Sequence, residues 1–421
     1  MDDDREYTPL SQALKVLGEL RVRSATERVG LRDAFGRILA EEIRSREDVP
    51  RFDSSHFDGY AVASSETLRA SRDSPVTIVL MKAVAGPGKP RPPNLAKGRA
   101  MRVLTGAYLP RGADAVVARE DVEERPGAVS VKQPVDAGEH VYPAGADAGK
   151  GDLLFEPGKT IVGQDLVLLT SLRVGGVRVF RRPRVTIIPT GSELARNPND
   201  ASGKVVESHS VLLERLIDGA GGLPKTYPIV GDDKSAISRS IARALRESDV
   251  VLTLAGSSVG EPDLVEGAIR AFGKANSRLV HGLRVNRGRV MGFAVVGGRP
   301  IVILPGPIQG ALNAFIVMGY PLIRRHLGRG MEEPPALAAT MENDWEASGR
   351  YRDFDQVVYL TVRPAAEGTP RLMASASGAA TEKMSFLVGK NAYAMVPGTR
   401  PRLSKGEQVW ARLLPGFSWL G

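Results

Sequence analysis

Between residues 184 and 327 the chain alternates between short apolar runs and longer amphipathic segments. The pattern predicts strands at 184–189, 226–230, 249–254 and 301–304, and helices at 208–219, 234–246, 262–273 and 308–327. Strands that alternate with helices of these lengths form a parallel sheet covered by helices on both faces. We therefore expect this part of the chain to fold as a doubly wound parallel sheet domain.

Three of the predicted strands end in loops of small residues, two of them bearing acids: Thr190-Gly191-Ser192-Glu193, the segment from Ala255 to Asp263, and Pro305-Gly306-Pro307. In an open parallel sheet such loops lie at the carboxyl edge, where ligands bind. The middle loop contains Gly256, Ser257, Ser258 and Gly260, and it precedes a helix predicted to open at Pro262. Its amides and hydroxyls are suited to holding a phosphate.

The segments around this domain have different patterns. Residues 49–142 carry short β runs separated by Gly and Pro, which predicts a β-rich insertion domain. Residues 1–48 and 143–182 contain amphipathic stretches and are expected to form a discontinuous helical linker domain. The α/β domain is assigned to 183–330. Residues 331–421, with β runs at 356–362, 392–396 and 407–414, are expected to form a C-terminal β-barrel-like domain. The predicted fold class is thus α/β and multidomain.

Composition restricts the chemistry. The formal charge is +9, but basic and acidic residues are interspersed and no nucleic-acid motif is present, so we expect small phosphate-bearing ligands and no nucleic acid. There is no cysteine, and the five histidines lack metal-ligand spacing, so any metal would bind to oxygens. No apolar run reaches the roughly 18 residues of a membrane span, and the acidic start is unlike a signal peptide. We expect a cytoplasmic protein without a membrane segment.

Two polar segments of the insertion have both a structural and a functional interpretation. The first runs from Asp53 to Val62, and its Asp58-Gly59 pair is typical of a hairpin turn. The second begins at Thr105-Gly106 and can be a loop that leads into a strand. Taken alone, either segment favours the structural interpretation, and only together with the strand-end loops do they indicate a site.

In order and spacing, the motifs resemble those of the molybdopterin molybdenumtransferase family, the MoeA and gephyrin E-domain group. The matching segments are 53–62, 105–117, 183–194, Gly231-Asp232-Asp233, 258–263 and Leu304-Pro305-Gly306. The resemblance covers nearly the whole chain and identifies it as a divergent member. It implies that the α/β domain is MogA-like.

The resemblance implies a Mg²⁺-dependent step of molybdenum cofactor synthesis. In it adenylylated molybdopterin binds, its pyrophosphate linkage is cleaved, and molybdate is inserted at the dithiolene with release of AMP. The implied catalytic residues are Asp58, Thr105, Glu193 and Asp263. The implied Mg²⁺ ligands are Glu193, Asp232 and Asp263. The implied substrate-binding residues are Thr190, Gly191, Ser192, Gly256, Ser257, Ser258, Gly260, Pro305, Gly306, Arg289, Arg350 and Ser377.

The resemblance also implies a homodimer, in which Asp58 and Thr105 of one subunit reach the sheet edge of the other. Each acid retains a structural alternative. Glu193 and Asp263 can stabilise helix N-termini by interacting with the helix dipole. Either Asp232 or Asp233 can cap the helix from Lys234, and the sequence does not distinguish which of the two is the ligand.

One loop departs from the family. Asn286 and Arg287 stand where the family has Lys and Pro, Arg289 retains a cation at the second lysine, and Pro307-Ile308 replaces Asn-Pro. Two functions therefore remain open. One is an active molybdenumtransferase that uses molybdate or tungstate. The other is a paralogue that binds the pterin nucleotide, or acts as a dimeric scaffold, without inserting metal. Asn286→Lys combined with Arg287→Pro is expected to strengthen oxyanion dependence.

Overall fold

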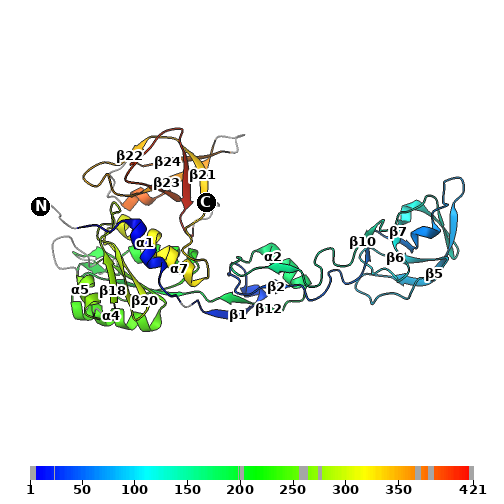
Figure 1. Cartoon of the computed structure of the whole chain (residues 1–421), viewed down its shortest axis with the longest axis horizontal. Helices are drawn as coiled ribbons and strands as arrows, with labels where there is room; N and C mark the ends of the chain where they lie inside the picture. The colour runs from blue at the N-terminus through cyan, green and yellow to red at the C-terminus, as the bar shows by residue number, and fades with distance from the viewer. Residues whose placement is uncertain are drawn as a thin grey trace. The chain divides into compact units, whose positions relative to one another are not determined.

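The computed structural model describes residues 6–22, 24–197, 199, 203–255, 264–273, 277–365, 371–377 and 384–416. The chain forms two compact units (Figure 1). Unit 1 comprises Met1–Glu27 and Phe180–Gly421, and unit 2 comprises Arg28–Val179. These units are coarser than the four domains that we predicted, whose boundaries stay a prediction.

Unit 1 contains a six-stranded sheet in the order β16-β13-β17-β20-β19-β18. The first four strands are parallel: β16 (Leu223–Thr226), β13 (Arg184–Pro189), β17 (Val250–Leu254) and β20 (Arg299–Leu304). The last two, β19 (Gly292–Val296) and β18 (Ser277–His281), form an antiparallel hairpin that the sequence did not predict. Its connection, residues 282–291, is longer than the short turns that have recognisable sequence signals.

The strand predicted at 226–230 begins and ends earlier, at Leu223 and Thr226. Its early end is explained by Pro228, which has no N–H to donate to the neighbouring strand. The Tyr227 amide still donates to the Ile187 carbonyl, but the next bond to β13 is formed only by the Val230 amide, which donates to the Pro189 carbonyl at 2.9 Å.

Helices cover both faces of the sheet, which confirms the doubly wound arrangement. On one face, α4 (Lys234–Glu247) and α5 (Leu264–Arg270) bury apolar side chains against Ile188, Val251 and Ile303. The alternate residues Ile187 and Leu252 are also fully buried. The other helices described between residues 184 and 327 are α3 (His209–Gly219), α6 (Ile308–Ala314) and α7 (Tyr320–His326).

The single helix predicted at 308–327 contains a π-helical turn, Phe315–Gly319, between α6 and α7. Pro321 in the first turn of α7 has no N–H and its ring crowds the preceding turn, so the regular bonding pattern cannot pass through it.

Helix α1 (Leu10–Gly18) belongs to unit 1, whereas we had grouped residues 1–48 with residues 143–182. Its apolar stripe is buried, as the spacing predicted. Just beyond its end, the Leu20 carbonyl accepts a hydrogen bond from Arg325 of α7 at 2.7 Å, and Figure 1 shows the two helices together. Before it, the Thr8 amide donates to the Gly282 carbonyl at 2.9 Å, which ties the N-terminal segment to the connection between β18 and β19.

The predicted C-terminal β-barrel is confirmed. Five strands close in the order β21-β24-β23-β25-β27. They are β21 (Ala336–Met341), β24 (Leu372–Ala376), β23 (Gln356–Pro364), β25 (Ala392–Val396) and β27 (Gln408–Leu413). A two-stranded ladder of β22 (Trp345–Glu346) and β26 (Arg402–Leu403) packs on the same core.

Unit 2 holds a six-stranded sheet in the order β7-β4-β6-β5-β9-β8, as expected for a β-rich insertion. Its strands are β4 (Gly59–Val62), β5 (Val76–Ala85), β6 (Arg99–Val103), β7 (Ala115–Ala118), β8 (Val122–Arg125) and β9 (Ala128–Val131), and β3 (Ser54–Ser55) pairs with β10 (Val141–Tyr142) beside it. The rest of unit 2 combines α2 (Gly163–Ser171) with a short ladder of β2 (Ile43–Arg44) with β11 (Leu153–Phe155). A second short ladder, of β1 (Thr26–Gly30) with β12 (Gly176–Phe180), includes the residues at which the chain passes from one unit to the other.

The Asp58-Gly59 pair is not a hairpin turn. Gly59 begins β4, and a side chain there would place Cβ 2.1 Å from the Val117 carbonyl oxygen of β7. The glycine is needed because two backbones approach closely.

In the described part of the chain, no helix is both long and apolar enough to cross a membrane.

Candidate functional site

The strands of unit 1 that precede the predicted loops end at one edge of the sheet, as predicted. The Thr190 amide donates to the Leu254 carbonyl at 2.9 Å, and the Ala255 amide donates to the Leu304 carbonyl at 3.1 Å. The Gly191 amide donates to the Val230 carbonyl at 2.9 Å. These bonds bring together the ends of β13, β17 and β20 and the segment that follows β16.

The loop from Thr190 to Glu193 folds back on itself. Gly191 has a φ of 141°, and a Cβ at this position would lie 2.6 Å from both carboxylate oxygens of Glu193. Only glycine therefore lets the Glu193 side chain lie against the loop. Thr190 is buried and its hydroxyl donates to the Leu254 carbonyl at 3.1 Å, whereas Ser192 and Glu193 are exposed. Glu193 is thus accessible to a ligand, and Thr190 shapes the backbone.

The adjacent acids Asp232 and Asp233 have different partners. The Asp233 carboxylate accepts a hydrogen bond from the Ala236 amide at 2.6 Å and caps α4. The Asp232 carboxylate instead accepts the Ser192 amide at 2.9 Å, while the Asp232 amide donates to the Ser192 hydroxyl at 2.9 Å. Of the two, Asp232 is therefore the acid that faces the loop of Glu193.

Glu193 and Asp232 are compatible with a Mg²⁺ site. Asp263, the third predicted ligand, lies outside the described residues, as do Gly256, Ser257, Ser258 and Gly260. Within the described residues no cluster of three or more His, Asp or Glu side chains is arranged for a metal. Mg²⁺ commonly uses one or two carboxylates together with water and substrate phosphates, so an exposed pair of acids fits this cation.

In unit 2, Asp58 and Thr105 lie in contact. One Asp58 oxygen accepts hydrogen bonds from the amide and the hydroxyl of Thr105, both at 2.7 Å. These bonds, the amide bond first, lower the pKa of Asp58, and the charges of Arg102 and Arg119 add to the effect. The Asp58 carboxylate is therefore an anion at neutral pH and a weak base.

The loop that departs from the family, residues 286–290, is attached to the C-terminal barrel. The Asn286 side chain donates to the Gln356 amide oxygen at 2.7 Å, and the Asn286 amide donates to the Asp355 carbonyl at 2.8 Å. The Asn286 carbonyl accepts a hydrogen bond from the side-chain amide of Asn313. The Asn313 side chain in turn accepts a hydrogen bond from the Tyr359 hydroxyl at 2.7 Å. Asn286 thus serves as an anchor of the loop.

The double change Asn286→Lys with Arg287→Pro, from which we expected stronger oxyanion dependence, does not fit the backbone of this loop. Arg287 has a φ of 56°, whereas proline fixes φ near −65°. Its amide also donates to the Asn286 side chain at 2.9 Å, a bond that proline cannot form. A lysine at position 286 would likewise lose the hydrogen bond from the Arg287 amide, because its side chain has no acceptor.

Arg289, the cation that is predicted to bind the oxyanion, packs on Tyr351. Its guanidinium carbon lies 3.9 Å from the centre of the Tyr351 ring, and it donates to the Tyr351 hydroxyl. Exposed Arg350 lies 5.7 Å from the same ring. Tyr351 and Gln356 were missed because a single tyrosine and a single glutamine carry no sequence signal until the fold brings them to the loop.

Ser377 lies with the start of this loop. A recess of about 40 Å³ is lined by Asn286, Arg287, Gln309, Trp345, Gln356, Val357, Val358, Tyr359, Ser377 and Phe386. Since one water needs roughly 10–15 Å³ of such space, the recess suits a small polar group and not a pterin. Pro305 is buried and Gly306 is half-buried at the end of β20.

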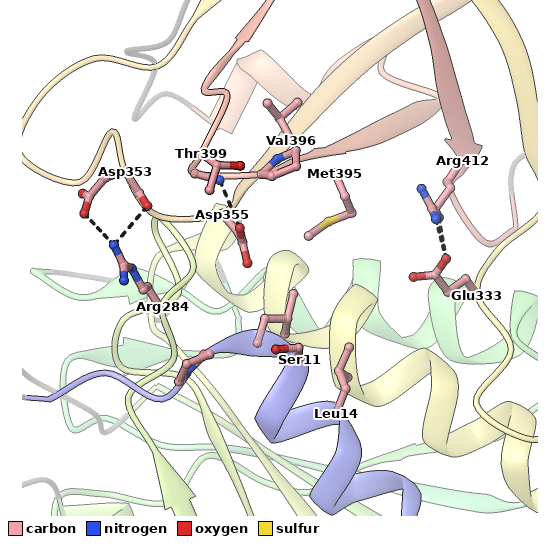
Figure 2. Close-up of a pocket in the computed structure, with 14 residues that line it drawn as sticks. Ser11, Leu14, Arg284, Glu333, Asp353, Asp355, Met395, Val396, Thr399 and Arg412 are labelled. Atoms are coloured by element: carbon pink, nitrogen blue, oxygen red, sulfur yellow. Dashed lines mark hydrogen bonds and ion pairs between the residues drawn. The ribbon is translucent and has the colours of Figure 1, made fainter.

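A larger pocket, of about 580 Å³, lies between α1 and the barrel (Figure 2). Leu14 and Met395 form part of its apolar wall. Figure 2 shows an ion pair on each side, Arg284 with Asp353 at 2.8 Å and Arg412 with Glu333. No predicted site residue lines this pocket.

The two adjacent aspartates should differ in their effect on stability. Asp233→Ala removes the N-cap acceptor of α4 and is expected to lower the free energy of unfolding by about 1 kcal/mol. Asp232→Ala removes an exposed side chain and is expected to change that free energy by less than about 0.5 kcal/mol. Urea unfolding followed by circular dichroism measures both variants, and equal losses would contradict the assignment of Asp233 as the cap.

Nearly the whole chain is similar to known proteins. Residues 8–172 match the family model described as "MoeA N-terminal region (domain I and II)", and residues 186–325 match "Probable molybdopterin binding domain". The molybdopterin molybdenumtransferase of Nostoc sp. is 27% identical over 97% of this chain and 95% of its own length. That of Bacillus subtilis is 26% identical over 98% and 96%.

Solved structures of related proteins support the same assignment. Two crystal structures of molybdopterin biosynthesis MoeA proteins from Pyrococcus horikoshii match with TM-scores of 0.85 and 0.80, at 30% and 27% identity. They cover 98% and 97% of this chain, and 100% of each solved chain is covered. The chain therefore belongs to the molybdopterin molybdenumtransferase family, the MoeA proteins of molybdenum cofactor biosynthesis.

Proposed function

We propose that this protein inserts molybdate into adenylylated molybdopterin, in a Mg²⁺-dependent reaction that cleaves the pyrophosphate linkage and releases AMP. The observation that carries the proposal is the placement of Glu193 and Asp232 at the carboxyl edge of the sheet, with Asp232 held in place by Ser192. This edge is where phosphate-bearing ligands bind in doubly wound folds.

The residues divide the work by their chemistry. Glu193 and Asp232 would hold Mg²⁺, which when bound offsets negative charge as the phosphoanhydride bond breaks. The Ser192 amide donates to the Asp232 carboxylate and the Ser192 hydroxyl accepts from the Asp232 amide, so the orientation of the carboxylate is set before a ligand arrives. Because its pKa is lowered, Asp58 is suited to accept hydrogen bonds from a substrate group or a water and not to remove a proton.

The oxyanion would bind near Arg289. Its guanidinium is held against Tyr351, and the loop around it is anchored to the barrel by Asn286. A cation fixed in this way is suited to a tetrahedral dianion such as molybdate or tungstate.

The second candidate function is the paralogue that binds the pterin nucleotide, or acts as a dimeric scaffold, without inserting metal. The use of Asn286 as an anchor favours it, because no charge remains at that position.

A direct assay tests the reaction. The purified protein, given adenylylated molybdopterin, Mg²⁺ and molybdate, should release AMP, and chelation of Mg²⁺ should stop the release. Asp232→Ala should lower the rate by about a hundredfold, the scale of losing one electrostatic contact in a transition state. Asp233→Ala is the matched control and should retain activity. Substrate binding without any AMP release would instead support the paralogue.

We also propose a homodimer in which Asp58 of one subunit completes the edge that Glu193 and Asp232 form in the other. Asp58→Ala and Asp232→Ala homodimers should both be strongly impaired, whereas mixing the two subunits should restore activity in the heterodimers, because each heterodimer contains one intact site. Light scattering checks the oligomeric state. A monomer at micromolar concentration, or mixed dimers without activity, would contradict the shared site.

Arg289→Ala should raise the KM for molybdate by roughly ten- to a hundredfold, since a charge-assisted contact is worth about 1.5–3 kcal/mol. Arg284→Ala is the control, because it removes the same charge from the same connection but at the side chain that pairs with Asp353. If molybdate and tungstate affect neither the wild type nor Arg289→Ala while adenylylated molybdopterin binds, the insertion chemistry is absent and the paralogue is the correct assignment.

A further inference from the structure

A single histidine joins helix α5 to the loop that carries Arg289. His281, the last residue of β18, has a side chain that is 13% exposed. Its Nδ1 lies 2.8 Å from a carboxylate oxygen of Glu266 on α5. Its Nε2 lies 3.0 Å from the carbonyl oxygen of Val290, the residue after Arg289. The imidazole therefore bridges two elements that are separate in the sequence.

The position of the ring depends on its neighbours. His281 pairs with Gly292 on β19, where a Cβ would lie 3.1 Å from the His281 Cδ2 and 2.3 Å from the Val280 carbonyl oxygen. The absence of a side chain at Gly292 leaves room for the ring. On α5, Arg270 donates to the other Glu266 oxygen at 2.7 Å, so the carboxylate is fixed from two sides.

Both contacts of the ring are with acceptors. A carbonyl accepts hydrogen bonds and cannot donate them, and the same holds for an ionised carboxylate. The pKa of Glu266 is lowered despite its burial, through the hydrogen bond from Arg270 and the charge of His281, so the carboxylate is ionised. Both bonds therefore form at once when both ring nitrogens carry a proton.

Each of the two elements adjoins, in the sequence, a segment that is predicted to bind one of the ligands. Helix α5 follows directly on segment 255–263, the predicted phosphate-binding segment, and Glu266 lies in its first turn. Val290 follows Arg289, the predicted oxyanion cation, whose side chain packs on Tyr351. A shift of α5 on nucleotide binding would be transmitted through Glu266 and His281 to the Val290 carbonyl.

We infer that His281 is a positioning residue that links the nucleotide side of the site to the oxyanion side, so that the two ligands bind cooperatively. The inference rests on the proposed function, because that function supplies the two ligands. Energetic coupling between two sites needs an element that both ligands bias, and the Glu266–His281–Val290 bridge is such an element.

The experiment measures coupling and not activity. The Kd of the full-length protein for molybdate is measured by calorimetry with and without saturating AMP, and the ratio of the two values gives the coupling. In the wild type the ratio should lie at roughly 5–150, the usual range for coupled sites. His281→Phe fills the same space without either hydrogen bond, and its ratio should fall to about one, while the Kd for AMP alone changes by less than about threefold.

Two variants of Glu266 separate the bridge from general stability. Glu266→Gln preserves it, because the new amide donates to Nδ1 of a neutral ring whose Nε2–H still donates to Val290. Its ratio should stay near the wild-type value. Glu266→Ala breaks the bridge and should abolish the coupling. If His281 had a merely structural role, the variants would bind both AMP and molybdate more weakly, and the ratio of the two Kd values for molybdate would not change.

Each outcome decides the matter. Coupling that is equal in the wild type, His281→Phe and Glu266→Ala overturns the inference and leaves the proposed function intact, as does a wild type that binds both ligands without coupling. If the wild type binds neither AMP nor molybdate, the ligands are wrong, and the inference falls together with the proposed function. If His281→Phe does not fold, the comparison of Glu266→Gln with Glu266→Ala gives the same decision.

Discussion

The parallel ladder of β13, β17 and β20 determines where the candidate residues of unit 1 lie. Pro189 pairs with Leu254 and Leu254 pairs with Leu304, so all three strands leave the sheet at the same level. The residues that follow the strands directly, Thr190 and Ala255, each donate to the last residue of the next strand, whatever their side chains. Glu193 lies at this edge because of that register, and Asp232 joins it through the Gly191–Val230 hydrogen bond and the two bonds with Ser192.

Much of this arrangement was predictable from the sequence, because period and turn chemistry are local. The alternation between 184 and 327 gave the parallel sheet and its helices, and the β runs after residue 355 gave the barrel. The errors also have local causes. Pro228 interrupts the ladder of its strand, and Gly59 is required by the proximity of Val117 and not by a turn. The hairpin of β18 and β19 was missed because its long connection has no turn signal.

The finer features of the site depend on contacts between distant residues. Asp232 and Asp233 are equivalent in the sequence, and only the extended backbone of Asp233, at φ −123° and ψ 115°, makes it the cap. Tyr351 lies far along the chain from Arg289, and their contact follows from the docking of the barrel on the connection between β18 and β19. A cation over an aromatic ring gains about 0.5–2 kcal/mol, which holds the guanidinium in place at a lower entropic cost than a flexible lysine has.

The left-handed backbone of Arg287 has a consequence for how such proteins can be recombined. Loop 286–290 takes its shape from a residue with φ 56° and from side chains of the barrel that accept its hydrogen bonds. A loop transplanted from a relative with proline at this position would carry a backbone that this barrel does not fit. In a chimaera the loop, Tyr351 and Gln356 form one exchangeable module, because the loop alone does not encode its own conformation.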